Sequence, residues 1–176
     1  MITSKDELKP FLDIELSDTD NDTLIHSVLK AADNKVKNYL RYNPEAVVTT
    51  SEEKRVYKSR FVPLDHGPIT TIVSITDSNG VAYETDEYRI AEKGIVEFLG
   101  ALSATTVNVT YSGGYDENEM PEDLKLAVWV IAESLYNRRG SFGAKKENFS
   151  SFSTEYQDGI PPDAQDILND YRRVLL

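Results

Sequence analysis

The fold of this chain is decided by the stretch Tyr111-Ser112-Gly113-Gly114-Tyr115, a short acidic spacer, and then Met120-Pro121-Glu122-Asp123-Leu124. A strand ends at the double glycine, and Pro121 stands where a helix can begin without losing a needed N–H group. Acidic residues in the first turn and Arg138 and Arg139 in the last suit the helix dipole, and Gly140 is placed to end the helix. We therefore predict a strand, a tight turn and a helix over residues 121–139.

Helical periodicity marks two further segments on either side of this stretch. Apolar residues at helical spacing predict a long helix near residues 20–41, namely Leu24, Ile25, Val28, Leu29, Ala32, Val36, Tyr39 and Leu40. Ser4 and Glu7 form a capping-box pattern that opens a short helix, which Pro10 limits to a turn or two. A last amphipathic helix is expected over residues 162–174, with Ile167, Leu168, Tyr171 and Val174 on its apolar side.

Between the helices the period of the sequence changes to two. We expect Val56, Lys58, Arg60 and Val62 to share one face of a strand, and residues 68–75 are rich in β-branched side chains. Asp77-Ser78-Asn79-Gly80, before Val81-Ala82-Tyr83, and Glu92-Lys93-Gly94 are turn signals. Five or six short strands at such close spacing favour antiparallel pairing.

The fold class predicted is therefore α+β, with a helical core and an inserted antiparallel β-rich block. We expect one domain over residues 1–176, with helical parts 1–44 and 116–176 and the β-rich insertion at 53–115.

Composition excludes several classes of function. The chain has 176 residues, a net charge of −11 and no cysteine, which rules out disulfides, thiolate metal sites and a cysteine nucleophile. The acidic excess is present in every third of the chain, so phosphate neutralisation of DNA or RNA is not expected. No apolar run approaches the length of a membrane span and no signal peptide is visible, so we expect an intracellular protein without a membrane partner.

No catalytic, cofactor or metal site is predicted. Asp18, Asp20 and Asp22 imitate the start of a calcium loop, but Thr23 and Leu29 occupy the positions that need glycine and glutamate. We interpret these acids as a helix start, with Asp20 or Asn21 as the cap. His26 and His66 have no evident partners, and the glycines after residue 139 lack the spacing of a phosphate loop.

Four aromatic residues stand in the polar stretch from residue 140 to 159: Phe142, Phe149, Phe152 and Tyr156. One interpretation is that this stretch folds back and covers the core of its own domain. The other is that it is poorly ordered in the free chain and that these aromatics anchor a partner protein when it docks. The sequence does not separate the two, and we take the four residues as a candidate protein interface.

In the order of its motifs the whole chain resembles the head–tail connector (adaptor) proteins of long-tailed bacteriophages and prophages. The fragments that carry the resemblance run from Thr3-Ser4-Lys5-Asp6-Glu7-Leu8 and Asp22 to Leu40, through Gly67-Pro68-Ile69, Val73-Ser74-Ile75 and Asp86-Glu87-Tyr88, to Val109-Thr110-Tyr111, Gly113-Gly114-Tyr115, Pro121 to Val128, Leu135-Tyr136, Arg139 and Ile160 to Arg173.

The resemblance implies a non-enzymatic virion component in the neck, made in the host cytoplasm and assembled as a ring, usually dodecameric, beneath the portal protein. Such a ring extends the DNA channel, through which duplex DNA passes without specific binding, and it docks the stopper or tail-completion protein. An acidic wall repels phosphates and agrees with that role. The alternative is a stand-alone binding module with a ligand site on the β-rich block, served by surface aromatics such as Tyr83, Tyr88 and Tyr115.

Overall fold

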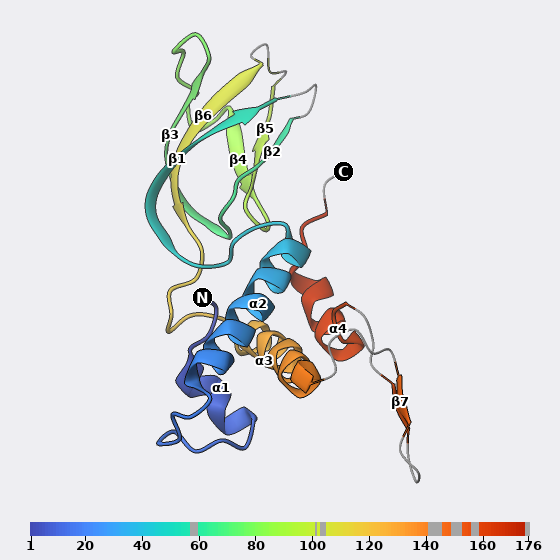
Figure 1. Cartoon of the computed structure of the whole chain (residues 1–176). Coiled ribbons are helices and arrows are strands. Elements are labelled where there is room, and N and C mark those ends of the chain that lie inside the picture. Colours follow the sequence, from blue (N-terminus) through green and yellow to red (C-terminus); the bar gives the residue numbers. More distant parts are fainter. Residues whose placement is uncertain are drawn as a thin grey trace. The chain divides into compact units, whose positions relative to one another are not determined.

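The computed structural model describes residues 1–56, 60–100, 102, 105–140, 146–148, 153–155 and 159–174. It divides the chain into two compact units. Unit 1 consists of Met1–Tyr39 and Pro121–Tyr171, and unit 2 consists of Leu40–Met120 with the chain end from Arg172. Four α-helices and two three-stranded antiparallel sheets confirm the predicted α+β class (Figure 1).

Unit 1 is helical. It contains α1 (Lys5–Phe11), α2 (Asp22–Leu40, whose last residue belongs to unit 2), α3 (Glu122–Asn137) and α4 (Pro162–Tyr171). A 3₁₀ turn, η1 (Arg138–Gly140), follows α3, and β7 (Lys146–Asn148) pairs with β8 (Ser153–Glu155). The predicted capping box is present at the start of α1, where the Ser4 side chain and Glu7 bond reciprocally.

The apolar stripes predicted on the helices form the core of unit 1. Its buried apolar residues in the helices are Leu8, Ile25, Val28, Leu29, Ala32, Val36, Leu124, Ala127, Val128, Ile131, Ala132, Ala164 and Leu168. The first residues of the chain contact two helices, because Ile2 N donates to Asp33 Oδ1 in α2 (2.8 Å) and Trp129 Nε1 in α3 donates to Thr3 Oγ1 (2.9 Å). The N-terminus is thereby held against the helical core.

Unit 2 contains two antiparallel sheets, drawn in cyan, green and yellow in Figure 1. One has the order β1 (Val47–Arg55), β6 (Thr106–Gly113), β3 (Ile69–Asp77); the other has the order β2 (Phe61–Pro63), β5 (Ile95–Phe98), β4 (Tyr88–Ala91). One buried cluster is formed by both sheets: Val56, Val62, Leu64, Ile69, Ile75, Val96, Phe98, Val107, Val109 and Tyr111. The strand that leads into the double glycine, β6, is central in its sheet.

Three predicted boundaries are corrected by the structure. The strand expected through Val56 and Val62 is two strands, since β1 begins at Val47 and ends at Arg55, and β2 begins at Phe61 in the other sheet. Residues 81–83 contribute only an isolated bridge, Thr76 to Ala82, rather than a strand. The last helix ends at Tyr171 instead of residue 174, because the chain leaves unit 1 there. Val174 consequently lies off that helix and is exposed.

Candidate functional site

The four aromatics predicted to anchor a partner, Phe142, Phe149, Phe152 and Tyr156, lie outside the described residues. Their role stays a prediction. The described part of the chain does, however, show which contacts are made by the motifs that carry the family resemblance.

The double glycine is required by close approach of two chain segments in unit 2. Gly114 has a φ of +85°, and a Cβ built on it would lie 2.1 Å from the Glu45 carbonyl oxygen. Gly114 N donates to Pro68 O and Tyr115 N donates to Pro44 O, both at 2.7 Å. A side chain at this glycine would separate the chain segments that these bonds hold together, so the turn needs glycine for space as well as for conformation.

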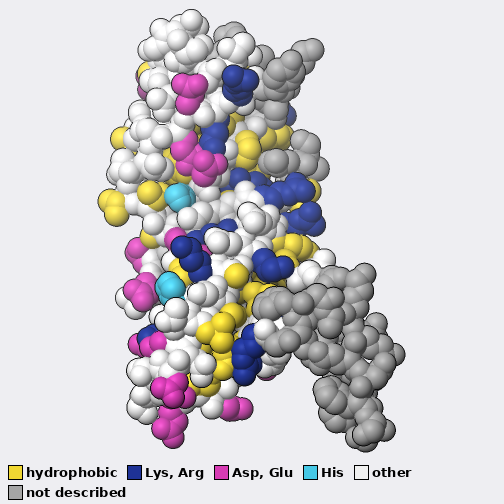
Figure 2. Space-filling model, viewed as in Figure 1, with side chains coloured by type: hydrophobic (Ala, Val, Ile, Leu, Met, Phe, Trp, Pro, Cys, Tyr) yellow, Lys and Arg dark blue, Asp and Glu magenta, His cyan; other side chains and the backbone are white. Residues whose placement is uncertain are grey.

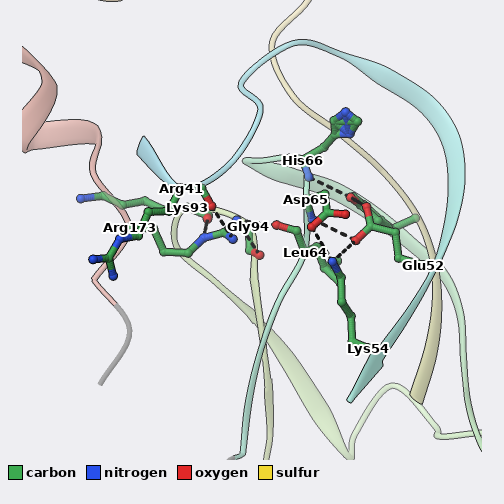
Figure 3. Close-up of polar contacts among 10 residues, drawn as sticks. Arg41, Glu52, Lys54, Leu64, Asp65, His66, Lys93, Gly94 and Arg173 are labelled. Carbon is green, nitrogen blue, oxygen red and sulfur yellow. Dashed lines mark hydrogen bonds and ion pairs between the residues drawn. The ribbon is translucent and has the colours of Figure 1, made fainter. Parts of the chain in front are cut away.

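Arg173, which follows the last helix, is buried in unit 2 with 3% of its surface exposed. Its guanidinium donates to the backbone carbonyls of Lys93 (2.8 Å from Nε), Arg41 (3.1 Å from Nη1), and Leu64 and Gly94 (2.7 and 3.2 Å from Nη2) (Figure 3). These acceptors are neutral, so the positive charge is held by dipoles instead of by a carboxylate. Burial lowers the pKa of Arg173.

The room for this guanidinium comes from Gly94. A Cβ on Gly94, whose φ is +76°, would lie 2.5 Å from Arg173 Nη2 and 2.6 Å from the His66 carbonyl oxygen. Gly67 is equally tight, because its Cβ would be 2.9 Å from Gly94 Cα. The predicted turn Glu92-Lys93-Gly94 is therefore one wall of the Arg173 site. A backbone bond from Arg173 N to Leu40 O (3.0 Å) completes the attachment of the chain end.

A second polar group of unit 2 lies beside it (Figure 3). Tyr111 donates its hydroxyl proton to Glu52 and accepts from His66 N at 3.0 Å. Burial and the bond to Glu52 raise the pKa of Tyr111. Lys54 bonds both Glu52 (3.0 Å) and Asp65. Burial acts to lower the pKa of Lys54, but these two carboxylates outweigh it and raise that pKa.

In unit 1, residues 3–7 form a hydrogen-bonded group centred on Glu7. Its carboxylate accepts from Thr3 Oγ1 (2.9 Å), from Ser4 N (2.8 Å) and from Lys125 Nζ on α3 (3.0 Å). Burial opposes the charge, yet these donors lower the pKa of Glu7 to about 2. The carboxylate therefore joins the N-terminus to α3.

The Arg173 guanidinium and the carboxylates of Glu7 and Glu52 are bonded to side chains or backbone, while His66 Nδ1 is buried without a hydrogen-bond partner in the described part of the chain. The described residues hold no group of three or more acids or histidines placed for a metal ion. His26 is exposed on α2, and His66 Nε2 lies 3.1 Å from Asn43 Nδ2. No helix among the described residues is long and apolar enough to cross a membrane.

The tyrosines named for the alternative binding module are partly buried in unit 2. Tyr83 and Tyr88 pack on Phe98, with ring centroids 5.0 and 6.4 Å apart, and so cover the core of unit 2. Tyr115 is half-buried. A hollow of about 330 Å³ in unit 2 is lined instead by Glu53, Thr76, Asp77, Ser78, Thr106, Val107 and Asn108. These three tyrosines are absent from its lining.

Sequence reasoning missed two buried cations, Lys9 and Arg173. Lys9 is 1% exposed and, within unit 1, donates to Leu16 O (3.2 Å) and Asp18 O (2.6 Å) and pairs with Asp22 (2.6 Å). In the sequence, Arg173 stands out only as the last residue of the closing motif Ile160 to Arg173. The one signal that could have found it is its place at the end of an amphipathic helix, and that signal does not distinguish a buried arginine from a solvated one.

Comparison with known proteins gives a family. The family model described as "Head completion protein" matches residues 1–174. No curated protein sequence matches the chain.

Solved structures share the fold. A chain in the neck of an empty GTA particle computed with C6 symmetry superimposes with a TM-score of 0.63 at 17% identity, covering 99% of this chain and 91% of that chain. A chain of the virion of a native gene transfer agent (GTA) particle gives 0.59 at 17% identity, with the same coverage. A chain in the native GTA neck computed with C12 symmetry gives 0.55 at 16% identity, covering 97% and 88%.

Proposed function

We propose that this chain, which belongs to the head completion protein family, is a structural subunit of the neck of a tailed, phage-like particle. The observation that carries the proposal is the family match over residues 1–174. The similar fold of neck chains along nearly the whole length supports it. The predicted resemblance to head–tail connectors is confirmed at the level of the family. A role of this kind needs no catalysis, and we assign the chain none.

The finer proposal is that the chain acts as a single connector domain and forms a ring, dodecameric in the virion, beneath the portal protein. Chains of similar fold occur in GTA particle necks that were computed with C6 and C12 symmetry. A closed ring joins two different surfaces of neighbouring subunits. Such a ring would continue the DNA channel and dock the stopper or tail-completion protein, after assembly in the host cytoplasm.

Duplex DNA should pass through this ring without specific binding. The net charge is −11, and Figure 2 shows Asp and Glu side chains on the visible faces of both units. Repulsion from the phosphates keeps DNA from adhering to such a surface. In a mobility-shift assay at physiological salt we expect no complex. Salt-sensitive binding equivalent to several phosphate contacts would contradict the channel proposal.

For Phe142, Phe149, Phe152 and Tyr156 we retain the proposal of a partner interface. Replacing Phe149 and Phe152 together by Ser should leave the melting temperature of the isolated subunit nearly unchanged while impairing assembly. A lower melting temperature with normal assembly would place these aromatics in the core of the subunit instead.

The function itself is tested on heads assembled without this chain. Purified protein is added to DNA-filled heads that carry the portal, and the particles are sedimented and imaged. We expect the protein to sediment with the heads and to add ring-shaped density at the portal vertex, and we expect heads lacking the portal to bind none. Equal binding to both kinds of head, or to neither, would refute the neck assignment.

A further inference from the structure

The tight turn that follows β3 in unit 2 (Figure 1) holds the only Asn-Gly pair in the sequence, Asn79-Gly80. Asn-Gly pairs are the most reactive asparagine sites in proteins, because glycine has no side chain that shields its backbone nitrogen from the neighbouring amide carbon. Both residues are exposed, and a Cβ built on Gly80 would meet no atom of the described chain beyond its neighbours within 4 Å. Water therefore has access to this pair.

The reaction that such a pair undergoes is an intramolecular deamidation. The backbone nitrogen of Gly80 loses its proton to hydroxide and attacks Cγ of Asn79, which closes a succinimide ring. The Cγ–Nδ2 bond breaks, and ammonia leaves with a proton taken from water. A second water molecule then opens the ring at one of its two carbonyls. The product is aspartate at residue 79, or isoaspartate where the chain continues through the former side chain.

Asp77 holds both reacting groups of the pair in place. Gly80 N donates its proton to the backbone carbonyl of Asp77 at 3.0 Å, so the nucleophilic nitrogen is occupied. Asn79 Nδ2 donates to Asp77 Oδ2 (3.3 Å) and Asn79 N donates to Asp77 Oδ1 (2.8 Å), so the side-chain amide is held toward residue 77. Attack of Gly80 N on the amide carbon therefore requires the turn to open.

The Asp77 carboxylate also fastens the far side of the turn. Val81 N donates to Asp77 Oδ1 at 2.9 Å, and Asp77 N donates to Val81 O at 2.8 Å. The bond from Val81 N is the main cause that lowers the pKa of Asp77, so this carboxylate is charged at neutral pH. Hydrogen bonds to a charged acceptor are stronger than neutral ones, and local opening has to break them. The carboxylate thus opposes the motion that the reaction requires.

We propose that Asn79 is a site of spontaneous deamidation in this chain and that the Asp77 carboxylate sets the rate by keeping the turn closed. Aspartate at residue 79 places a second negative charge where Asp77 Oδ2 now receives a donor, and isoaspartate adds a backbone atom to the turn. Tyr83 N donates to Ile75 O (2.9 Å) just beyond the turn, so the lengthened chain loosens the end of β3. The site lies within one subunit, and the proposal is independent of the neck assignment.

The test compares the folded chain with the same chain unfolded in guanidinium chloride, both in the same mildly alkaline buffer. Mass spectrometry of the peptide that contains residue 79 follows the replacement of NH₂ by OH, and an isoaspartate-specific methyltransferase detects the isomer. We expect the unfolded chain to react faster by about tenfold or more, because opening breaks several bonds to a charged acceptor. Asn79→Gln should abolish the reaction at this residue, since glutamine would have to close a less favourable six-membered ring.

Substitutions of Asp77 test its control of the rate. Asp77→Ala removes the carboxylate and should raise the rate in the folded chain by about tenfold or more. Asp77→Ser, whose hydroxyl fastens a turn more weakly, should fall between wild type and Asp77→Ala. Asp86→Ala is the matched control, because it removes an exposed acid outside the turn with the same change in net charge, and it should leave the rate unchanged. Melting curves show which variants are folded, and Asp77→Ser decides if Asp77→Ala is not.

Three results would overturn the proposal. If residue 79 stays unmodified in the unfolded chain, it is not a site of deamidation. Equal rates in the folded and unfolded chains would show that the turn gives no protection. If the folded Asp77 variants react at the wild-type rate, Asp77 does not set that rate. Each of these results leaves the binding of the chain to portal-bearing heads as a separate measurement.

Discussion

Replacing Arg173 by Ala should destabilise unit 2 more than any other change at the end of the chain. The substitution removes four hydrogen bonds from a side chain that is 3% exposed. Gly94 O keeps a partner, since Leu64 N donates to it at 2.9 Å. The carbonyls of Arg41 and Lys93 belong to residues with some access to water. Leu64 O loses its charged donor in a fully buried residue and bears most of the cost.

The expected loss of stability in Arg173→Ala follows from which of the four carbonyls keep a hydrogen-bond partner or access to water. One buried carbonyl left without its donor costs about 1–3 kcal/mol. Weakened bonds at the other acceptors and lost packing against the Tyr42 ring, whose centroid is 5.0 Å from the guanidinium carbon, bring the total to about 2–4 kcal/mol. For a chain of this length that corresponds to a fall in melting temperature of roughly 5–15 °C.

The assay is thermal unfolding followed by circular dichroism, with urea unfolding as a second measurement. Val174→Ala is the matched control, since Val174 is exposed next to Arg173, and it should change stability by less than about 0.5 kcal/mol. Arg173→Lys keeps the charge but cannot present the same fork of donors, so it should fall between the two. If Arg173→Ala melts within a degree of wild type, the carbonyl site does not hold the chain end.

Three more substitutions test other parts of the structure. Gly114→Ala should lower the free energy of unfolding, measured in urea, by a few kcal/mol, because its Cβ meets a backbone oxygen. Gly80 has a similar φ of +81° but open space around it, so Gly80→Ala should lower the free energy of unfolding clearly less. Equal losses of stability in the two variants would contradict the argument from space. The pKa of Glu7 is lowered to about 2, so its carboxylate stabilises the fold at pH values above its ordinary pKa of about 4.5, and this stabilisation is lost as the pH falls toward 2. Glu7→Gln should therefore flatten the acid side of the stability–pH curve. An unchanged curve would show that Glu7 does not contribute. Val128→Asp puts an unpaired charge in the core of unit 1 and should abolish cooperative unfolding or lower the melting temperature severely, so a variant melting like wild type would remove Val128 from the core.

Local chemistry in the sequence determined much of the secondary structure. Ser4 and Glu7 identify the start of α1, and Pro121 with its acidic neighbours identifies the start of α3, because helix ends are set by groups within a few residues. The apolar stripe of α2 and the alternation of β6 follow from periods of 3.6 and 2, which any one segment displays by itself. The antiparallel pairing of β4 with β5 followed from the short turn Glu92-Lys93-Gly94 between them, whereas β6 pairs with β1 and β3, which lie farther away in the chain.

Only the tertiary structure decided where some of these segments end and which groups they contact there. The helical pattern of residues 162–174 continues to Val174, but the helix ends at Tyr171. The chain leaves the helix there because the Arg173 guanidinium donates to the backbone carbonyls of residues 41, 64, 93 and 94. Those acceptors come from three separate parts of the chain, and no pattern within one segment reveals that they converge. The double glycine is similar: the sequence predicts its turn, while the collision with the Glu45 carbonyl that makes glycine necessary depends on a segment about seventy residues away. Folding decides which hydrogen-bonding groups come together and where space is left between segments. A sequence can therefore show that a residue is able to bind without showing what it binds.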